Sequence, residues 1–225
     1  MPVPDEMIFL FDVDNTLLDN DRVEADINAH IERECGLQGR DRFWTIFEQL
    51  RGEVGYADYL GALQRFRVEA IHDPRVLSVS SFLLDYPFKR RVYPRACEAL
   101  AHVRQWGRTV ILSDGDAVFQ PRKIRRAGLW DAVEGRVLIY IHKERMLNDV
   151  TRLYPAARYV MIDDKLAILA EMKQAWPERL TTVFPRQGHY ARDDRIISQF
   201  PAADLTIEHV ADLVECNYSD FAGSG

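Results

Sequence analysis

Two aspartates and a threonine, Asp12, Asp14 and Thr16, directly follow the apolar run 7–11 near the start of the chain. Continuous apolar runs are typical of strands that are buried on both faces, and such a strand cannot hold two carboxylates in its own core without a large desolvation cost. We therefore expect both carboxylates at the C-terminal end of the strand, where open α/β sheets bind ligands. Carboxylates crowded together favour a cation, and a set of oxygen ligands suits Mg²⁺.

Three further apolar runs also lead to polar residues. They are 109–112, followed by Ser113 and Asp114; 137–141, which leads to Lys143; and 159–162, followed by Asp163 and Asp164. Because the carboxyl ends of parallel strands lie along one edge of a sheet, we expect these side chains to meet Asp12 and Asp14 in one cleft.

Predicted helices alternate with strands in the second part of the chain. Helices are expected over 95–106, through Lys123 and Arg126, and over 143–153, 165–175 and 208–215, with further strands at 180–184 and 204–207. Gly107 and Gly128 stand where C-terminal glycines commonly end helices. Strand–helix alternation of this kind implies right-handed crossovers and an α/β fold with a three-layer, Rossmann-like core and a mostly parallel sheet.

The segment 20–88 differs from the rest because its patterns are helical throughout. Apolar residues recur at helical spacing within 23–31, 43–50 and 59–66, and 74–85 is also expected to be helical. The sequence thus predicts a small helical bundle inserted after the first strand. Two parts are expected, an α/β core of 1–19 and 89–225 and a helical unit of 20–88.

The composition limits the class of protein. A chain of 225 residues that is 47% hydrophobic and 28% charged is expected to bury a proper core and to be soluble. A net charge of -6 without a long basic run argues against a nucleic-acid partner, and no apolar stretch approaches the roughly 20 residues that span a bilayer. The three scattered cysteines are typical of a reduced, cytoplasmic protein. The oligomeric state is left open.

The pattern Asp-x-Asp-x-Thr directly after an apolar strand resembles the first motif of the haloacid dehalogenase (HAD) superfamily. Ser113 looks like the second motif, Lys143 like the third and Asp163-Asp164 like the fourth. The segment 20–88 lies where the superfamily carries an α-helical (type C1) cap. The chain departs from many relatives at Arg95, since they have glycine after the proline that precedes the first core helix.

The resemblance implies a Mg²⁺-dependent phosphomonoester hydrolase that acts on a small phosphorylated metabolite through an aspartyl-phosphate intermediate. Asp12 would be the nucleophile and a metal ligand. Asp14 would protonate the leaving alcohol, would then activate water, and would contact the metal through its backbone carbonyl. Lys143 would bridge Asp12 and the phosphate, and would neutralise charge as it spreads over the phosphate oxygens.

The other motif residues would complete the phosphate and metal sites. The Ser113 hydroxyl and the Asp114 backbone N–H would bind phosphate oxygens at a helix N-terminus, and Thr16 would join them while holding the turn near Asp14. Asp163 and Asp164 would complete the metal shell, with Asp164 favoured as the inner ligand.

Several alternatives stay open at this point. Ser113 could be an ordinary helix N-cap, and the Asp163-Asp164 pair could simply favour the dipole of the following helix. Lys123 is a rival of Lys143 but is expected on an exposed helix face, as is usual for lysine, and Lys165 is expected to be solvated.

Other functions also remain open: a phosphomutase, another phosphotransferase, a C–X hydrolase, or a catalytically idle binding module. Asp14 favours phosphate chemistry, because the resemblance implies that dehalogenases lack an acid there, since a halide leaving group needs no proton.

Overall fold

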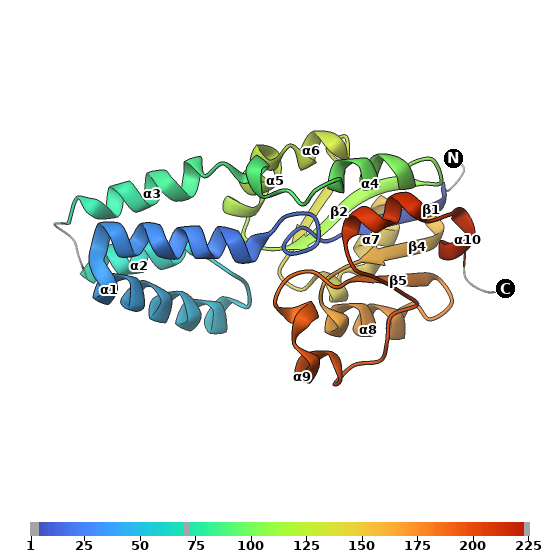
Figure 1. The fold of residues 1–225 in the computed structure, drawn as a ribbon. Helices are drawn as coiled ribbons and strands as arrows, with labels where there is room; N and C mark the ends of the chain where they lie inside the picture. The colour runs from blue at the N-terminus through green and yellow to red at the C-terminus, as the bar shows by residue number, and fades with distance from the viewer. Residues whose placement is uncertain (1–4, 70–72, 223–225) are drawn as a thin grey trace.

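The structure, a computed structural model, describes residues 5–69 and 73–222, so the chain ends and a short piece of the predicted helical unit lie outside the description. Six strands form one sheet (Figure 1): β1 (Asp5–Phe11), β2 (Arg108–Asp114), β3 (Val137–Tyr140), β4 (Ala156–Ile162), β5 (Leu180–Pro185) and β6 (Leu205–Ile207). Their order is β3-β2-β1-β4-β5-β6, and all five pairings are parallel. The predicted α/β fold with a parallel sheet is confirmed.

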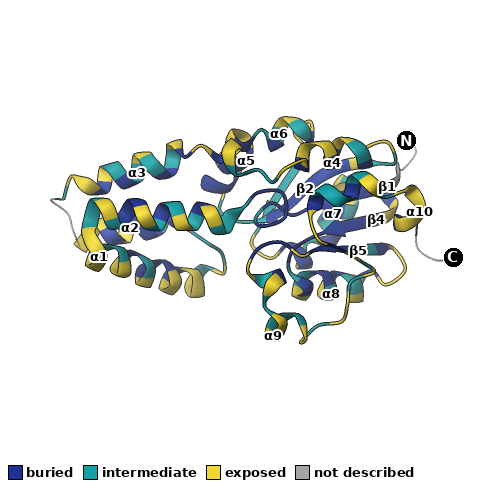
Figure 2. Cartoon of the chain, viewed as in Figure 1, coloured by how far each residue is buried: buried dark blue, intermediate teal, exposed yellow. Residues whose placement is uncertain are grey.

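Alternate residues of β1 enter the two layers that cover the sheet. Met7, Phe9 and Phe11 belong to a hydrophobic cluster with α4 (Ala96–Val103), α5 (Phe119–Ala127), α6 (Leu129–Ala132), the 3₁₀ turn η4 (Val210–Glu215) and α10 (Tyr218–Phe221). Ile8 and Leu10 belong to a second cluster with α7 (Leu147–Leu153), α8 (Leu166–Ala175) and α9 (Asp194–Ile197). Because successive strand residues point to opposite faces, this arrangement explains why the strand is apolar at every position from Met7 to Phe11. Figure 2 shows β1, β2, β4 and β5 as mostly buried strands, whereas β3 is half-buried.

Three helices form the segment between β1 and the second half of the chain. They are α1 (Asn20–Val54), α2 (Tyr59–Glu69) and α3 (Arg75–Asp85), and Figure 1 shows them extending beyond one end of the sheet. Helix α1 is broken at Gly36, whose φ of 75° and ψ of 175° are not helical, so its two halves match two of the predicted helical patterns. Between 20 and 88, the described residues contain no strand. The division into a core and a cap remains a prediction.

Aromatic side chains join these helices to the core. The ring of Phe119, at the start of α5, lies 5.2 Å from that of Tyr59 in α2 and 5.8 Å from that of Phe88. Phe88 begins the 3₁₀ turn η1 (Phe88–Arg91), which returns the chain to the core. A single hydrophobic cluster therefore runs from the three helices into one layer of the core.

Some predicted element boundaries were wrong. Helix α4 ends at Val103, so Gly107 is not its cap; a Cβ at position 107 would instead collide with the Met7 carbonyl, which explains the glycine. The helix predicted over 143–153 is split into a 3₁₀ turn, η2 (Lys143–Arg145), and α7. Gly128 does cap α5 in the left-handed conformation, with a φ of 80°. Within the described part of the chain, no helix is both long and apolar enough to cross a bilayer.

Candidate functional site

Three aspartates meet where β1 and β4 end. Phe11 pairs with Ile162, so Asp12 follows one strand and Asp163 and Asp164 follow the other, side by side. The carboxylates of the three residues offer oxygen atoms that all lie within 4.8 Å of one another, and all three residues are buried. The strand order explains the position, because β2 lies on one side of β1 and β4 on the other, and α/β sheets bind ligands at such a switch point.

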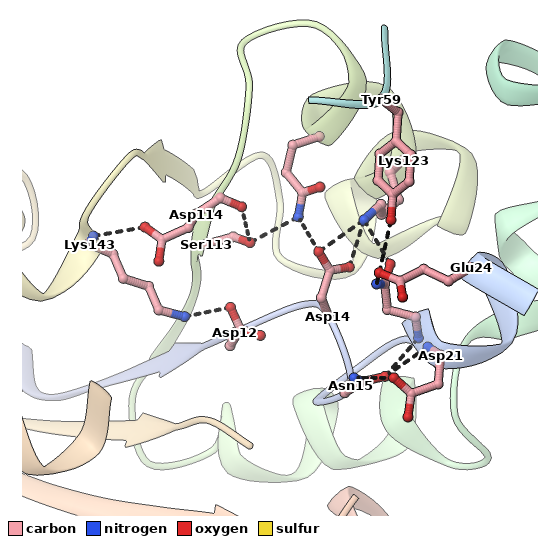
Figure 3. A network of polar contacts seen from close by, with 12 residues as sticks. Asp12, Asp14, Asn15, Asp21, Glu24, Tyr59, Ser113, Asp114, Lys123 and Lys143 are labelled. Carbon is pink, nitrogen blue, oxygen red and sulfur yellow. Dashed lines mark hydrogen bonds and ion pairs between the residues drawn. The ribbon is translucent and has the colours of Figure 1, made fainter. Parts of the chain in front are cut away.

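Lys143 joins this group from the loop after β3. Its Nζ lies 2.5 Å from Asp12 Oδ1 (Figure 3) and 2.6 Å from Asp163 Oδ2, and the residue is 2% exposed. Burial alone lowers the pKa of the Lys143 ammonium, but Asp12, Asp163 and Asp114 outweigh burial and raise it. Lys143 is therefore a permanently charged partner for the carboxylates.

Burial disfavours the negative charge of the aspartate group, and the neighbouring lysine does not fully offset this effect. It raises the pKa of Asp12 to about 7 against the opposing effect of Lys143, and burial together with Asp163 raises the pKa of Asp164 well above its usual range. Among residues 5–69 and 73–222, neither carboxylate oxygen of Asp164 has a hydrogen-bond partner, although both are buried. Buried, unpartnered carboxylate oxygens are costly, and hard oxygen donors of this kind fit Mg²⁺.

The loop after β4 is fixed by its neighbours. Asp163 Oδ1 accepts a hydrogen bond of 2.8 Å from the Lys165 backbone N–H, next to the start of α8. The Asp164 backbone N–H donates to the Thr16 hydroxyl at 3.1 Å, and Thr16 is fully buried. Thr16 thus ties the first motif to the fourth, and its predicted contact with phosphate remains a prediction.

Ser113 and Asp114 lie at the end of β2, beside the same edge. The Ser113 hydroxyl accepts a hydrogen bond of 3.0 Å from Gln120 Nε2, and Asp114 Oδ1 accepts one of 2.8 Å from the Lys143 backbone N–H. The alternative that Ser113 caps a helix is wrong, because α5 begins at Phe119 and the Asp116 side chain accepts from the Phe119 backbone N–H.

Asp14 points away from Asp12 and is held by Lys123 (Figure 3). The Lys123 Nζ lies 2.8 Å from Asp14 Oδ1 and 2.9 Å from Oδ2. Lys123 is 2% exposed, so the expectation of an exposed lysine was wrong. The sequence did contain a signal, because Phe119, Lys123 and Ala127 follow at four-residue spacing on the buried face of α5.

Lys165 is less exposed than the sequence suggested. Lys165 is half-buried, and Asp164, Asp12 and Asp163 raise the pKa of its ammonium although burial opposes them. His189 has a partner, since its Nδ1 lies 2.6 Å from Asp21 Oδ1 at the start of α1. Both residues line a cavity of about 540 Å³ that opens beside Asp14, between the helical segment and the core. From the helical side this cavity is lined by residues that include Glu24, Asn28, Trp44 and Arg51.

The chain is similar to known proteins over most of its length. The family model of haloacid dehalogenase-like hydrolases matches residues 7–175. A solved structure of a protein described as a haloacid dehalogenase-like hydrolase, from Burkholderia xenovorans LB400, is 64% identical; the alignment covers 96% of this chain and 99% of that one, with a TM-score of 0.91. The search of curated proteins found no match.

More distant structures share the fold. A haloacid dehalogenase-like family hydrolase from Xanthomonas campestris is 18% identical, with 96% of this chain and 91% of that chain covered and a TM-score of 0.62. L-2-haloacid dehalogenase from Xanthobacter autotrophicus, solved with chloropropionic acid covalently bound, is 15% identical, with 95% and 98% covered and a TM-score of 0.59. With the family match over residues 7–175, these findings show that the chain belongs to the haloacid dehalogenase-like hydrolases.

Proposed function

We propose that this hydrolase cleaves small phosphate monoesters with the help of Mg²⁺, through an aspartyl-phosphate on Asp12. The observation that carries the proposal is the group formed by Asp12, Asp163 and Asp164, with both oxygens of Asp164 buried and unpartnered among the described residues. A phosphate dianion could not approach three carboxylates unless cations balanced their charge. Lys143 supplies one positive charge, which leaves the group deficient.

Asp12, Asp163 and Asp164 are the residues that would hold the ion, and their oxygen donors suit Mg²⁺ better than a softer metal. When bound, the ion would screen the negative charge of the phosphate from the nucleophile. In the metal-free protein, protons take part of this role, because the pKa values of Asp12 and Asp164 are raised by burial.

The chain's own residues divide the remaining work. Asp12 would attack phosphorus, and Lys143, which touches Asp12 Oδ1, would stabilise the negative charge on the phosphate oxygens. The Ser113 hydroxyl, which accepts from Gln120 and donates to the Asp114 carbonyl at 3.3 Å, would turn its hydrogen to a phosphate oxygen when the substrate binds. Asp14 would give a proton to the leaving oxygen and would later take one from water.

The cavity beside Asp14 would hold the leaving group. Its volume of about 540 Å³ suits a small metabolite, and its position next to Asp14 would bring the leaving oxygen to the acid. Because its walls come from both α1 and the core loop around Tyr190, the helical segment would exclude water during the reaction.

The proposal is tested with p-nitrophenyl phosphate, with and without Mg²⁺. We expect turnover that needs Mg²⁺ and that falls at least ~10³-fold in Asp12→Asn, because the nucleophile is lost. The variant Asp164→Asn should weaken Mg²⁺ binding, whereas Asp85→Asn, a matched change of an exposed acid that pairs with Arg122, should do neither. Halide release from 2-chloropropionate without any phosphatase activity would overturn the proposal in favour of C–X hydrolysis.

A further inference from the structure

We propose that Lys123 is the positioning residue that holds Asp14 in the orientation for proton transfer and links it to the helical segment. The inference deepens the proposed function and rests on it. Lys123 lies in α5, 109 positions from Asp14 in the sequence.

The contact between the two residues fixes the whole carboxylate. Lys123 Nζ is within 2.9 Å of both oxygens of Asp14, and Gln120 Nε2 lies 3.2 Å from Oδ2. A carboxylate held at both oxygens cannot turn about its terminal bond without breaking an ion pair. Both partners come from consecutive turns of α5, a helix packed into the core, so the orientation of Asp14 is set by a rigid element.

The burial of Lys123 shows that this ion pair is not a surface contact. The side chain is 2% exposed, whereas that of Asp14 is 29% exposed and faces the cavity. A buried ammonium is costly unless its donors are satisfied, and Lys123 uses its three on Asp14 Oδ1, Asp14 Oδ2 and Asn20 Oδ1, the last at 3.1 Å. The buried ammonium of Lys123 is therefore stabilised mainly by Asp14.

The contact with Asn20 connects Asp14 to the helical segment. Asn20 is the first residue of α1, and its Nδ2 donates to Glu24 Oε1 at 3.1 Å. The Tyr59 hydroxyl of α2 donates to the same Glu24 oxygen at 3.0 Å (Figure 3). A continuous polar chain thus runs from Asp14 through Lys123 to α1, which lines the cavity, and on to α2.

Lys123 takes part in both halves of the reaction by stabilising the Asp14 carboxylate, which exists between the two proton transfers. In the first half, the proton of Asp14 passes to the leaving oxygen as the bond from that oxygen to phosphorus breaks, and the carboxylate that remains is stabilised by the ammonium of Lys123. In the second half, a water proton passes to the same carboxylate as the water oxygen attacks the aspartyl-phosphate, which restores Asp12 and releases phosphate. Lys123 itself transfers no proton in either half.

The test separates positioning from general damage by varying the leaving group. Ethyl phosphate needs a proton on its leaving oxygen, whereas 2,4-dinitrophenyl phosphate does not. In Lys123→Met we expect kcat/KM to fall ~100-fold for ethyl phosphate and less than ~5-fold for dinitrophenyl phosphate, as in Asp14→Asn. With dinitrophenyl phosphate, a burst of product should appear, because the attack of water on the aspartyl-phosphate still needs Asp14.

Two further comparisons keep the test decisive. Lys123→Gln, which keeps a hydrogen-bond donor but no charge, should show the same pattern if Lys123→Met folds poorly, and the double variant Asp14→Asn with Lys123→Met should be no worse than Asp14→Asn. Lys173→Met, which removes a half-exposed lysine paired with Asp204, is the matched control and should leave both rates unchanged. Equal losses on the two esters would overturn the role of Lys123. Absence of any ester hydrolysis by the wild-type chain would instead overturn the proposed function and this inference with it.

Discussion

The raised pKa of Asp12 predicts that the metal-free protein loses stability as the pH rises. Burial lifts the pKa of this carboxyl from its ordinary value of 3.8 to about 7, so the folded protein holds a proton that the unfolded chain has released between these limits. The free energy of unfolding should therefore fall by about 1.4 kcal/mol per pH unit in this window, and by about 4 kcal/mol in total. Above pH 7 the contribution should be constant.

The assay is urea denaturation of the wild-type protein and of Asp12→Asn in EDTA, at pH 5, 6, 7 and 8. The amide introduced by Asp12→Asn does not titrate, so the difference between the two unfolding free energies reports the Asp12 carboxyl together with its effect on Asp164, whose pKa is raised by burial and also by Asp12. We expect the variant to gain about 2 kcal/mol relative to the wild type between pH 5 and pH 7 and little more at pH 8. Lys143 adds no slope, because its ammonium stays charged throughout this range.

Added Mg²⁺ should reverse the loss of stability with rising pH, since the ion and the proton compete for the same carboxylate oxygens. With a pKa near 7, the proton on Asp12 should weaken the apparent Mg²⁺ affinity about 100-fold at pH 5 relative to pH 8. Parallel stability curves for the wild type and Asp12→Asn would refute the reasoning, and so would an Mg²⁺ affinity that does not change with pH.

Three further predictions concern side-chain packing and backbone conformation. Thr16→Val should cost about 1–3 kcal/mol in denaturation and also weaken Mg²⁺ binding, because the buried Asp164 N–H loses its acceptor; a loss of stability with unchanged Mg²⁺ affinity would contradict the link. Gly107→Ala should destabilise the fold by about 2 kcal/mol or more, since its Cβ would meet the Met7 carbonyl. Gly52→Ala in α1, with open space around it, should instead stabilise the fold by up to about 1 kcal/mol. Similar values for the two variants in urea denaturation would show that the backbone around Gly107 can move to accept a side chain. Arg95→Gly should change stability by less than about 1 kcal/mol, because relief of the left-handed conformation at a φ of 59° offsets the lost ion pair with Glu98, and a loss above about 2 kcal/mol by thermal denaturation would exclude this balance.

The elements that carry chemistry could be predicted because their signals are local. A carboxylate cannot lie in apolar surroundings without a large cost, so the apolar run before Asp12 must end at the edge of the core. The same holds for the runs that end at Ser113 and Asp163. Parallel strands then bring their ends to one edge, which is why residues far apart in the chain could be assigned to one cleft before the structure was known. The family resemblance assigned roles to these residues, and those roles are still untested.

The sequence could not determine which charged groups pair. Lys143 and Lys123 both follow strands, yet Lys143 contacts Asp12 while Lys123 turns to Asp14. That choice depends on how α5 packs against the loop after β1, where the contact joins residues 109 positions apart. The expected exposure of Lys123 was wrong for the same reason, since a lysine on a buried helix face is stable only if a distant carboxylate meets it.

The order of strands and helices, and the positions at which acids, a serine and a lysine follow the strands, could be read from the chain alone, because alternation and apolar runs are properties of neighbouring residues. Only the tertiary structure determined three features: the hydrogen bond from the Asp164 backbone N–H to Thr16, the ion pair between Lys123 and Asp14, and the cavity between α1 and the core. These contacts arise when separate elements pack, and the free energy of a buried polar group depends on partners that the local sequence does not contain.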